Sequence, residues 1–223
     1  MKKRILNMFT IVAISIAFVS CKDKAAEANT SDAEAAAVAE STSEKYVANV
    51  AESTIEWKGF KPTGSHNGTV NIESGVFKTD AGRIKSGTFL IDMKSIVSTD
   101  MEEGEYKTSL EEHLKGTVEG KEGDFFNVTK FPTGAFEVTG TKTEDGKTML
   151  SGNLSLKGQK HNITFPVTVS NNGDLMTIES EAFTIDRTKW GINYGSKSVF
   201  DNLGDKFIND DMELKIKIVA KKA

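Results

Sequence analysis

The chain has 223 residues and a formal net charge of −4, because 28 lysines and arginines are set against 32 aspartates and glutamates. The basic residues form no block, so the chain lacks the electrostatic footprint of a nucleic-acid-binding protein. Cys21 is the single cysteine, which means that a folded domain here must be stable without an intramolecular disulfide.

The first twenty residues have the pattern of a secretory signal peptide. Residues 2–4 are basic, and residues 8–19 are apolar except for two hydroxyl side chains. This run is too short to span a bilayer core of about 30 Å as a stable helix. Because Ser20 directly precedes Cys21, the segment resembles a lipoprotein signal, although Phe18 stands where that pattern usually has leucine.

The lipoprotein pattern predicts that Cys21 is acylated and becomes the first residue of the mature chain. We therefore expect an exported protein that is lipid-anchored to the cell envelope, at the outer membrane, on its periplasmic or surface face. The alternative for a lone exported cysteine is a free thiol or an intermolecular disulfide.

Residues 21–52 are predicted to form a flexible tether after the acylated cysteine. The segment consists mainly of Ala, Glu, Ser and Thr, with almost no large apolar side chain. Such a composition buries too little surface to offset the entropy lost on ordering. About thirty flexible residues have a root-mean-square reach of about 30 Å, so the tether would hold the domain away from the bilayer.

Residues 53–223 are predicted to form one all-β domain, because apolar and polar residues alternate along several runs. Ile55 and Trp57 share one face of such a run. Further faces consist of Phe89, Ile91 and Met93; of Leu150, Leu154 and Leu156; of Ile163, Phe165, Val167 and Val169; and of Met212, Leu214, Ile216 and Ile218.

Short turns rich in Gly, Asn and Asp separate these runs and favour hairpins, which predicts an antiparallel meander. About eight strands begin near Ser53, His66, Arg83, Phe131, Lys147, His161, Asp174 and Asp211. Eight such strands can stack as a sandwich or close into a barrel, and closure removes the exposed edges. A barrel of this size holds side chains or one small ligand, so a filled and a hollow interior both stay open.

Residues 105–116 break the strand pattern and predict a short amphipathic helix. Tyr106, Leu110 and Leu114 follow one another at intervals of four residues, and Gly116 ends the run. We expect the face formed by these three residues to pack over one end of the sheet.

The polar residues give no catalytic or metal-binding signal. His66, His113 and His161 are the only histidines, and none has the spacing of metal ligands; a site assembled from all three in space is the weaker alternative. Ser65 precedes His66, but neighbours in a strand point to opposite faces. Nucleophile-elbow and phosphate-binding motifs are absent from the sequence, so we expect neither an enzyme nor a cofactor.

Four stretches, residues 56–70, 89–100, 111–138 and 183–196, go beyond a general strand pattern. In order and spacing they resemble the YceI-like family, in the form common among lipoproteins of Bacteroidetes-type bacteria. The resemblance covers essentially the whole domain. It implies an eight-stranded, lipocalin-like antiparallel β-barrel that encloses a long apolar ligand, such as a polyisoprenoid or an isoprenoid quinone.

Candidate ligand-binding residues are the large inward-facing side chains of these strands. They are Trp57, Phe89, Ile91, Met93, Phe136, Leu154, Phe165, Phe183 and Trp190, with Leu110 and Leu114 as a lid. For each residue taken singly, plain core or wall packing is the favoured interpretation, since aromatic residues fill space in every small barrel, and the hypothesis needs only a subset of them to border a void. Arg187 has two interpretations: an ion pair with Asp92 or Asp186 at the barrel rim, or a contact with a polar headgroup of the ligand.

The leading functional hypothesis is a membrane-tethered carrier or store for an isoprenoid-type lipid. A solid-cored barrel with a structural or interaction role is the alternative, and an enzyme acting on a lipid headgroup is the least favoured. The sequence leaves open whether the chain forms a homodimer.

Overall fold

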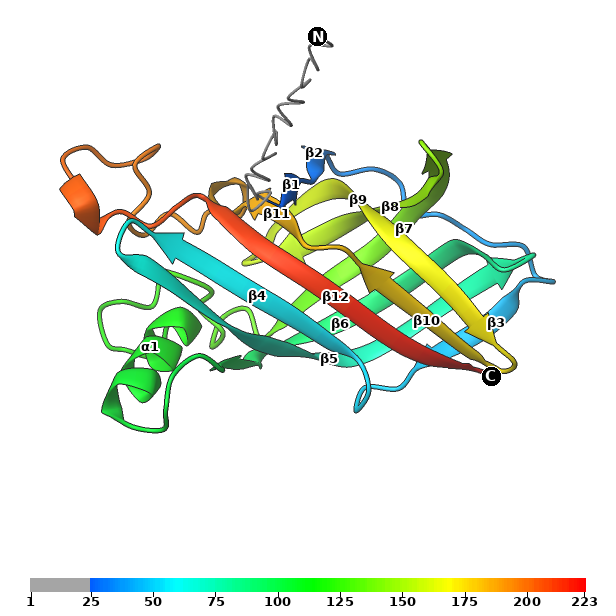
Figure 1. The fold of residues 1–223 in the computed structure, drawn as a ribbon, viewed down its shortest axis with the longest axis horizontal. Helices are drawn as coiled ribbons and strands as arrows, with labels where there is room; N and C mark the ends of the chain where they lie inside the picture. Colours follow the sequence, from blue (N-terminus) through cyan, green and yellow to red (C-terminus); the bar gives the residue numbers. More distant parts are fainter. Residues whose placement is uncertain (1–24) are drawn as a thin grey trace, which may run out of the picture.

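The computed structural model describes residues 25–223, which form one twelve-stranded sheet, an α-helix and two 3₁₀-helices (Figure 1). The predicted signal peptide and Cys21 lie outside the described residues. The elements are β1 (Ala26–Glu27), β2 (Asn29–Asp32), β3 (Glu44–Ala48), β4 (Thr54–Lys61), β5 (Gly64–Asp80), β6 (Arg83–Ser98), α1 (Glu105–Lys115), β7 (Thr133–Glu144), β8 (Lys147–Leu156), β9 (Gln159–Asn172), β10 (Leu175–Ser180), β11 (Phe183–Asp186), η1 (Arg187–Trp190), η2 (Gly204–Lys206) and β12 (Asp211–Lys222).

Eight of the strands close into a barrel. β4 pairs with β5, and antiparallel pairing continues in chain order through β6, β7, β8, β9 and β10. β10 then pairs with β12, and β12 pairs with β4, which completes the ring. The predicted eight-stranded antiparallel barrel is therefore confirmed, and ring closure gives each of these strands a partner on both sides along part of its length.

Tight turns set the register of the barrel hairpins. The turns at Ala81–Gly82, Asp145–Gly146 and Lys157–Gly158 each have positive φ at both positions. That backbone conformation matches the type I′ turn, whose twist suits two directly connected antiparallel strands. The predicted turn chemistry thus fixes which residues of neighbouring strands face the interior.

Gly152 gives an aromatic side chain room inside the barrel. It lies on the inward face of β8, beneath the ring of Phe136 on the neighbouring strand β7, and an added Cβ would collide with that ring. The glycine lets the ring lie flat against the wall instead of filling the centre of the barrel.

The barrel wall has a seam between β9 and β11. β10 and β11 both pair with β12. Of these two strands, only β10 also pairs with β9 within residues 25–223, so β9 and β11 are not joined directly. At the seam, β1 pairs in parallel with β11, and β2 pairs antiparallel with β9. The N-terminal strands thus complete the backbone pairing of the wall at this position.

The prediction of a flexible tether over residues 21–52 is wrong for the part of that range that the structure describes. Residues 25–48, which we call the strap, run from the seam along the outside of the barrel to β3 (Figure 1). Tyr46 is 1% exposed and stacks on Phe77 with ring centroids 5.4 Å apart. The folded domain therefore begins well before residue 53, because backbone pairing holds the strap where large apolar side chains are missing.

Two asparagines hold the middle of the strap against the outside of the barrel. Asn153 and Asn162 are 2% and 3% exposed, although they alternate with inward-facing residues of β8 and β9. Asn153 Nδ2 donates to the Glu34 carbonyl at 2.7 Å, and Asn153 Oδ1 accepts from the Glu34 N–H at 2.9 Å. Asn162 Nδ2 donates to Asn153 Oδ1 at 3.1 Å and to Thr139 Oγ1 at 2.9 Å.

One end of the barrel is packed solid. Tyr46, Phe77, Met176 and Ala220 are almost completely buried there, and the ring of Phe77 also contacts Phe89 at a centroid distance of 6.0 Å. This closed end contains the end of β5, the start of β10 and the end of β12. The hydrophobic core thus fills one half of the barrel rather than its full length.

The predicted helix is confirmed as α1, with Gly116 in the left-handed conformation at its C-terminus. Leu110 and Leu114 face the barrel, but Tyr106 is 85% exposed, so the expectation that it packs on the sheet is wrong. The helix has no fully buried residue. Glu111 helps to attach it, because its carboxylate accepts the Ser98 N–H at 2.9 Å at the end of β6. Among the described residues, no helix has the length and apolarity needed to cross a membrane.

We expect Asn153→Ala to release the middle of the strap. The substitution leaves the Glu34 backbone groups and Asn162 without their buried partner, which costs about 1–3 kcal/mol of the free energy of unfolding. Hydrogen exchange of residues 29–37 measured by mass spectrometry should speed up, while the closed end stays protected. The exposed Asn171→Ala is the matched control, and equal exchange in both variants would contradict a strap held by Asn153.

Asp100 ties β5 to β6 at the open end of the barrel and contributes to acid sensitivity. Burial alone would raise its pKa, but hydrogen bonds from Ser98, from the Asn67 N–H and from His66 outweigh burial and hold the pKa below 3.8. A carboxyl group with a lowered folded pKa stabilises the protein above its unfolded pKa, and this contribution is lost as the pH falls through the folded value.

We therefore expect Asp100→Asn to lower the free energy of unfolding by about 1 kcal/mol at neutral pH, and by progressively less below about pH 4. Urea unfolding of both proteins from pH 3 to pH 7 measures the difference. Exposed Asp201→Asn serves as the control. If Asp100→Asn lowers the free energy of unfolding by the same amount at every pH in this range, Asp100 does not contribute to acid sensitivity.

Candidate functional site

The open half of the barrel encloses an apolar cavity of about 310 Å³. Its wall comes from the inward faces of the barrel strands, and α1 and the segment 191–210 contribute side chains at the open end. A volume of this size lies in the range typical of small-molecule pockets.

The cavity is long and blind. Along β12 the lining runs from Asp211 to Ile218, a stretch of about 24 Å at the usual rise per residue of a strand. Beyond Ile218, the packed residues Met176 and Ala220 close the interior. Access is therefore from the opposite end, which we call the mouth, where Phe60, Leu110 and Tyr194 belong to the lining.

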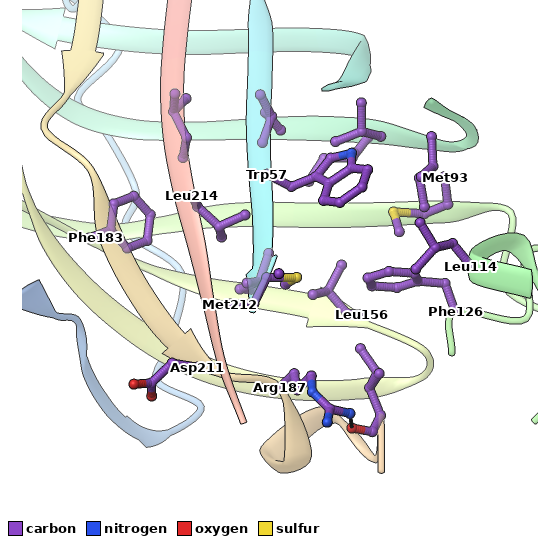
Figure 2. Close-up of a pocket in the computed structure, with 18 of the residues that line it drawn as sticks. Trp57, Met93, Leu114, Phe126, Leu156, Phe183, Arg187, Asp211, Met212 and Leu214 are labelled. Carbon is purple, nitrogen blue, oxygen red and sulfur yellow. Dashed lines mark hydrogen bonds between the residues drawn. The ribbon is translucent and has the colours of Figure 1, made fainter. Parts of the chain in front are cut away.

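Eleven of the twelve predicted ligand-binding residues line this cavity. They are Trp57, Phe89, Ile91, Met93, Leu110, Leu114, Phe136, Leu154, Phe165, Phe183 and Arg187. Figure 2 shows several of them pointing into the same space, with Trp57 and Met93 towards the helix side and Phe183 on the opposite side. The period-two pattern thus located the wall of a hollow interior.

Aromatic rings form one side of the cavity. Phe165 on β9 and Phe183 on β11 stack with centroids 4.3 Å apart, across the seam that the strap covers. Phe136 contacts Phe165 at a centroid distance of 5.8 Å. These rings form a smooth apolar surface that offers a ligand neither hydrogen-bond donors nor hydrogen-bond acceptors.

Trp190 does not line the cavity, in contrast to the prediction. Its side chain is fully buried, and its Nε1–H donates to the Leu154 carbonyl at 2.9 Å. The ring also meets His161 edge-on at a centroid distance of 5.2 Å. Trp190 is held in η1 beside the β8–β9 hairpin, a position that the alternation pattern of β11 does not reveal because the strand ends at Asp186.

Arg187 lines the cavity but is committed to structural contacts. Its guanidinium donates to the carbonyls of Asn209 at 2.9 Å, Ile192 at 2.6 Å and Ile208 at 3.0 Å. Its ion pair, at 3.8 Å, is with Asp210 rather than with Asp92 or Asp186. Burial lowers the pKa of Arg187, and the nearby carboxylates of Asp210 and Asp186 oppose this effect. The structure therefore supports the structural interpretation, in which Arg187 fastens both ends of the segment 191–210.

Two histidine–carboxylate pairs lie at the mouth. His66 Nδ1 is 3.1 Å from Asp100 Oδ2, and His113 Nε2 is 2.7 Å from Asp124 Oδ2. The ring of His113 also contacts Phe125 and Tyr194. These contacts join α1 to the two loops beside it, so His113 is a half-buried link between them.

The polar groups of the site lie mainly at one end of the cavity. Within residues 25–223, His, Cys, Asp and Glu form no group of three that could hold a metal ion. The polar lining groups, among them Lys61, His66 and Asn209, gather at the mouth, whereas the deeper wall is apolar except for Ser180, whose Oγ accepts the Ile216 N–H. Such an arrangement suits a molecule with a long apolar part inside and a polar end at the mouth.

Several cavity residues were missed because they lie in loops, where no period applies. They are Phe125, Phe126, Tyr194 and Ile208. Phe60 was also missed, although it lies in β4, because it does not share the period-two face of Ile55 and Trp57. Figure 2 shows Phe126 beside Leu114 of α1, consistent with the 3.1 Å hydrogen bond from the Phe126 N–H to the Leu114 carbonyl. The available signal was a pair of phenylalanines inside an otherwise polar, glycine-containing loop.

Comparisons with known proteins agree with this architecture. BcnA from Burkholderia cenocepacia has a similar structure, with a TM-score of 0.56 and 21% sequence identity, covering 78% of this chain and 99% of that chain. A polyisoprenoid binding domain from Saccharophagus degradans, implicated in plant cell wall breakdown, gives a TM-score of 0.56 at 11% identity, covering 80% of this chain and 98% of that chain. At these identities the likeness shows a shared fold. No curated protein sequence matches the chain.

A family model described as the YceI-like domain matches residues 46–220. The match includes Tyr46 and therefore most of β3, which the sequence prediction had placed in the tether. Since the match extends over well more than half of the sequence, this chain belongs to the family of YceI-like domain proteins.

Proposed function

We propose that this protein binds a long apolar lipid, a polyisoprenoid or an isoprenoid quinone, and acts as a carrier or store attached to the cell envelope. The observation that carries the proposal is the blind apolar cavity in the open half of the barrel. Its depth and its aromatic wall suit a chain-shaped ligand better than a compact polar one. A lipid tail needs such a shelter because it cannot cross an aqueous compartment unaided.

The energetics of tail burial are favourable. Each buried CH₂ group contributes about 0.8 kcal/mol, so a tail of about twenty carbons already approaches the practical limit of non-covalent affinity. The cavity lining extends for about 24 Å along β12, which exceeds the thickness of about 15 Å of one leaflet's hydrocarbon region. A tail much longer than this must fold back inside the barrel or extend out of the mouth.

The similar fold of a domain described as polyisoprenoid binding supports this ligand class. A binding role without catalysis is also supported by the position of the polar groups, which surround the mouth instead of converging on a point deep in the cavity. The alternative of a solid-cored structural barrel fits the closed end of the molecule but not the open half.

We further propose that Cys21 carries the membrane anchor, as the signal pattern of the first twenty residues indicates. The thiol would be lipid-modified after export, so the barrel would work at the membrane that holds its ligand. The short stretch between Cys21 and β1 supports a barrel that lies close to the bilayer.

The ligand proposal predicts a co-purifying lipid. Native mass spectrometry with organic extraction, on protein purified from its own envelope without detergent, should show one isoprenoid-type lipid per chain. A bare protein that also takes up neither quinones nor polyprenols would overturn the proposal in favour of the solid-barrel alternative.

Phe165→Leu is expected to change which tail lengths are retained, because it removes a ring from the cavity wall. Phe77→Leu is the matched control, since Phe77 is equally buried but lies at the closed end. Both variants should lose about 1–2 kcal/mol of the free energy of unfolding. Each protein is exposed to a mixture of polyprenols, and the bound lipids are extracted and identified. If Phe165→Leu retains the same tail lengths as Phe77→Leu and the wild-type protein, Phe165 serves only as core packing.

The anchor proposal predicts that Cys21→Ala abolishes lipid labelling. Cells grown with a labelled fatty acid should incorporate label into the wild-type protein and not into the variant, which remains as precursor or as soluble chain. Normal labelling of the variant would refute Cys21 as the attachment site.

A further inference from the structure

The strap fixes how far the barrel can stand from a membrane anchor at Cys21. Ala26 is the first residue of β1, five residues after Cys21. A stretch of five residues spans at most about 18 Å even when fully extended. The start of β1 is in turn fixed, because Ala26 pairs with Phe183 and the Ala28 N–H donates to the Thr184 carbonyl at 2.8 Å. An anchor at Cys21 therefore brings the seam side of the barrel to the bilayer.

The segment 191–210 extends from this same part of the molecule. β11, the partner of β1, ends at Asp186 and leads through η1 into the segment, which returns at Asp211 to pair with Asp186. Figure 1 shows the segment and the strands β1 and β2 on the same side of the barrel. Its base is firmly attached, because Arg187 binds the carbonyls of Ile192 and Ile208.

The tip of the segment presents apolar side chains to solvent. Val199 and Phe200 are each 47% exposed, and they follow a turn in which the Phe200 N–H donates to the Ser196 carbonyl at 2.9 Å. Tyr194, at the mouth, is 42% exposed. Adjacent exposed aliphatic and aromatic residues on a rigid base are costly in water, and they are typical of surfaces that meet a lipid interface or a partner.

The charges near the tip favour an uncharged apolar contact. Within the segment, Lys197 and Lys206 balance Asp201 and Asp205, while the third aspartate, Asp210, is paired with Arg187 at 3.8 Å. Lys197 lies over the Phe207 ring, 3.6 Å from its centroid. Long lysine side chains beside aromatic rings suit the boundary between headgroups and hydrocarbon. Binding through such a tip depends on burial of apolar surface and only weakly on the sign of the lipid headgroup.

We propose that the tip of the segment 191–210, carrying Val199 and Phe200, is a bilayer-contact surface that seats the mouth of the cavity on the membrane. This inference rests on the proposed anchor at Cys21 and extends it from attachment to orientation. Tyr194 and Ile208 of the same segment line the mouth. A tip inserted in the interface thus places the cavity entrance where a lipid tail can enter with little exposure to water.

A bilayer explains these features better than a second copy of the chain or another protein. With an anchor at Cys21, the 18 Å limit keeps the start of β1 near the bilayer, and the segment 191–210 follows β11, the strand that β1 pairs with. The opposite, closed end also exposes apolar residues, Val47 and Val76, but it has no opening and lies away from β1. Those two valines provide a control surface of the same chemistry.

The single cysteine permits a direct test. The unacylated mature chain, residues 21–223, is coupled through the Cys21 thiol to a maleimide-headgroup phospholipid in vesicles of phosphatidylcholine and phosphatidylethanolamine. The reference is the same chain capped with N-ethylmaleimide in solution. Amide hydrogen exchange of residues 196–207 is then compared between the two, at low and at high salt.

Exchange in residues 196–207 should become at least threefold slower on the vesicles, and high salt should leave this protection unchanged. Val199→Ser combined with Phe200→Ser should abolish it, whereas Val47→Ser combined with Val76→Ser should not. Equal exchange on vesicles and in solution, protection that survives the Val199 and Phe200 substitutions, or protection confined to the closed end would each overturn the inference.

These outcomes are separate from failure of the proposed function, because the assay needs neither a bound lipid nor natural acylation. If the ligand proposal fails, native mass spectrometry detects the protein without a bound lipid. If the anchor proposal fails, the wild-type protein incorporates no fatty-acid label. The exchange experiment still reports whether the tip contacts a bilayer.

Discussion

Closure of the eight-stranded ring is the constraint on which the other features of this molecule depend. Because β12 returns to β4, every barrel strand has a partner on each side over part of its length, and the apolar faces are forced inward. The interior then has to be either filled or empty, since no alternative surface is available to these side chains. The protein does both: stacked Tyr46 and Phe77 fill one end, whereas the other end holds a cavity of about 310 Å³.

The difference between the two ends follows from where the large side chains lie and what they rest on. At the closed end, Tyr46 stacks on Phe77 of the neighbouring strand, and Phe77 in turn contacts Phe89 on the next strand. In the open half, Phe136 lies flat over Gly152, and Phe165 stacks against Phe183, so the rings line the wall and leave the centre empty. A glycine under an aromatic ring thus helps to create space in a barrel whose diameter alone would allow a filled core.

The sequence predicts the barrel well because period-two alternation and two-residue turns are local signals. The expected starts of all eight barrel strands lie within two residues of those observed, and eleven of the twelve chosen site residues line the cavity. The failures occur where side-chain period carries no information. Trp190 lies in a 3₁₀-helix after its strand, and Tyr194 and Phe126 reach the mouth from loops. Tyr106 has helical spacing with Leu110, yet the helix is turned so that the tyrosine faces solvent.

The strap shows why a composition argument for disorder can fail. Residues 25–43 contain few large apolar side chains and could not fold alone, but they meet strands that already have unpaired backbone groups at the seam. Pairing with β9 and β11 satisfies those groups, and the buried amide of Asn153 fixes the Glu34 backbone with two hydrogen bonds. Because the seam lies beside the Phe165–Phe183 stack, the same segment that limits the distance to Cys21 also covers the aromatic wall of the cavity. The proposed attachment to the envelope and the proposed enclosure of an apolar ligand therefore depend on one stretch of chain, and a change in the strap would act on both.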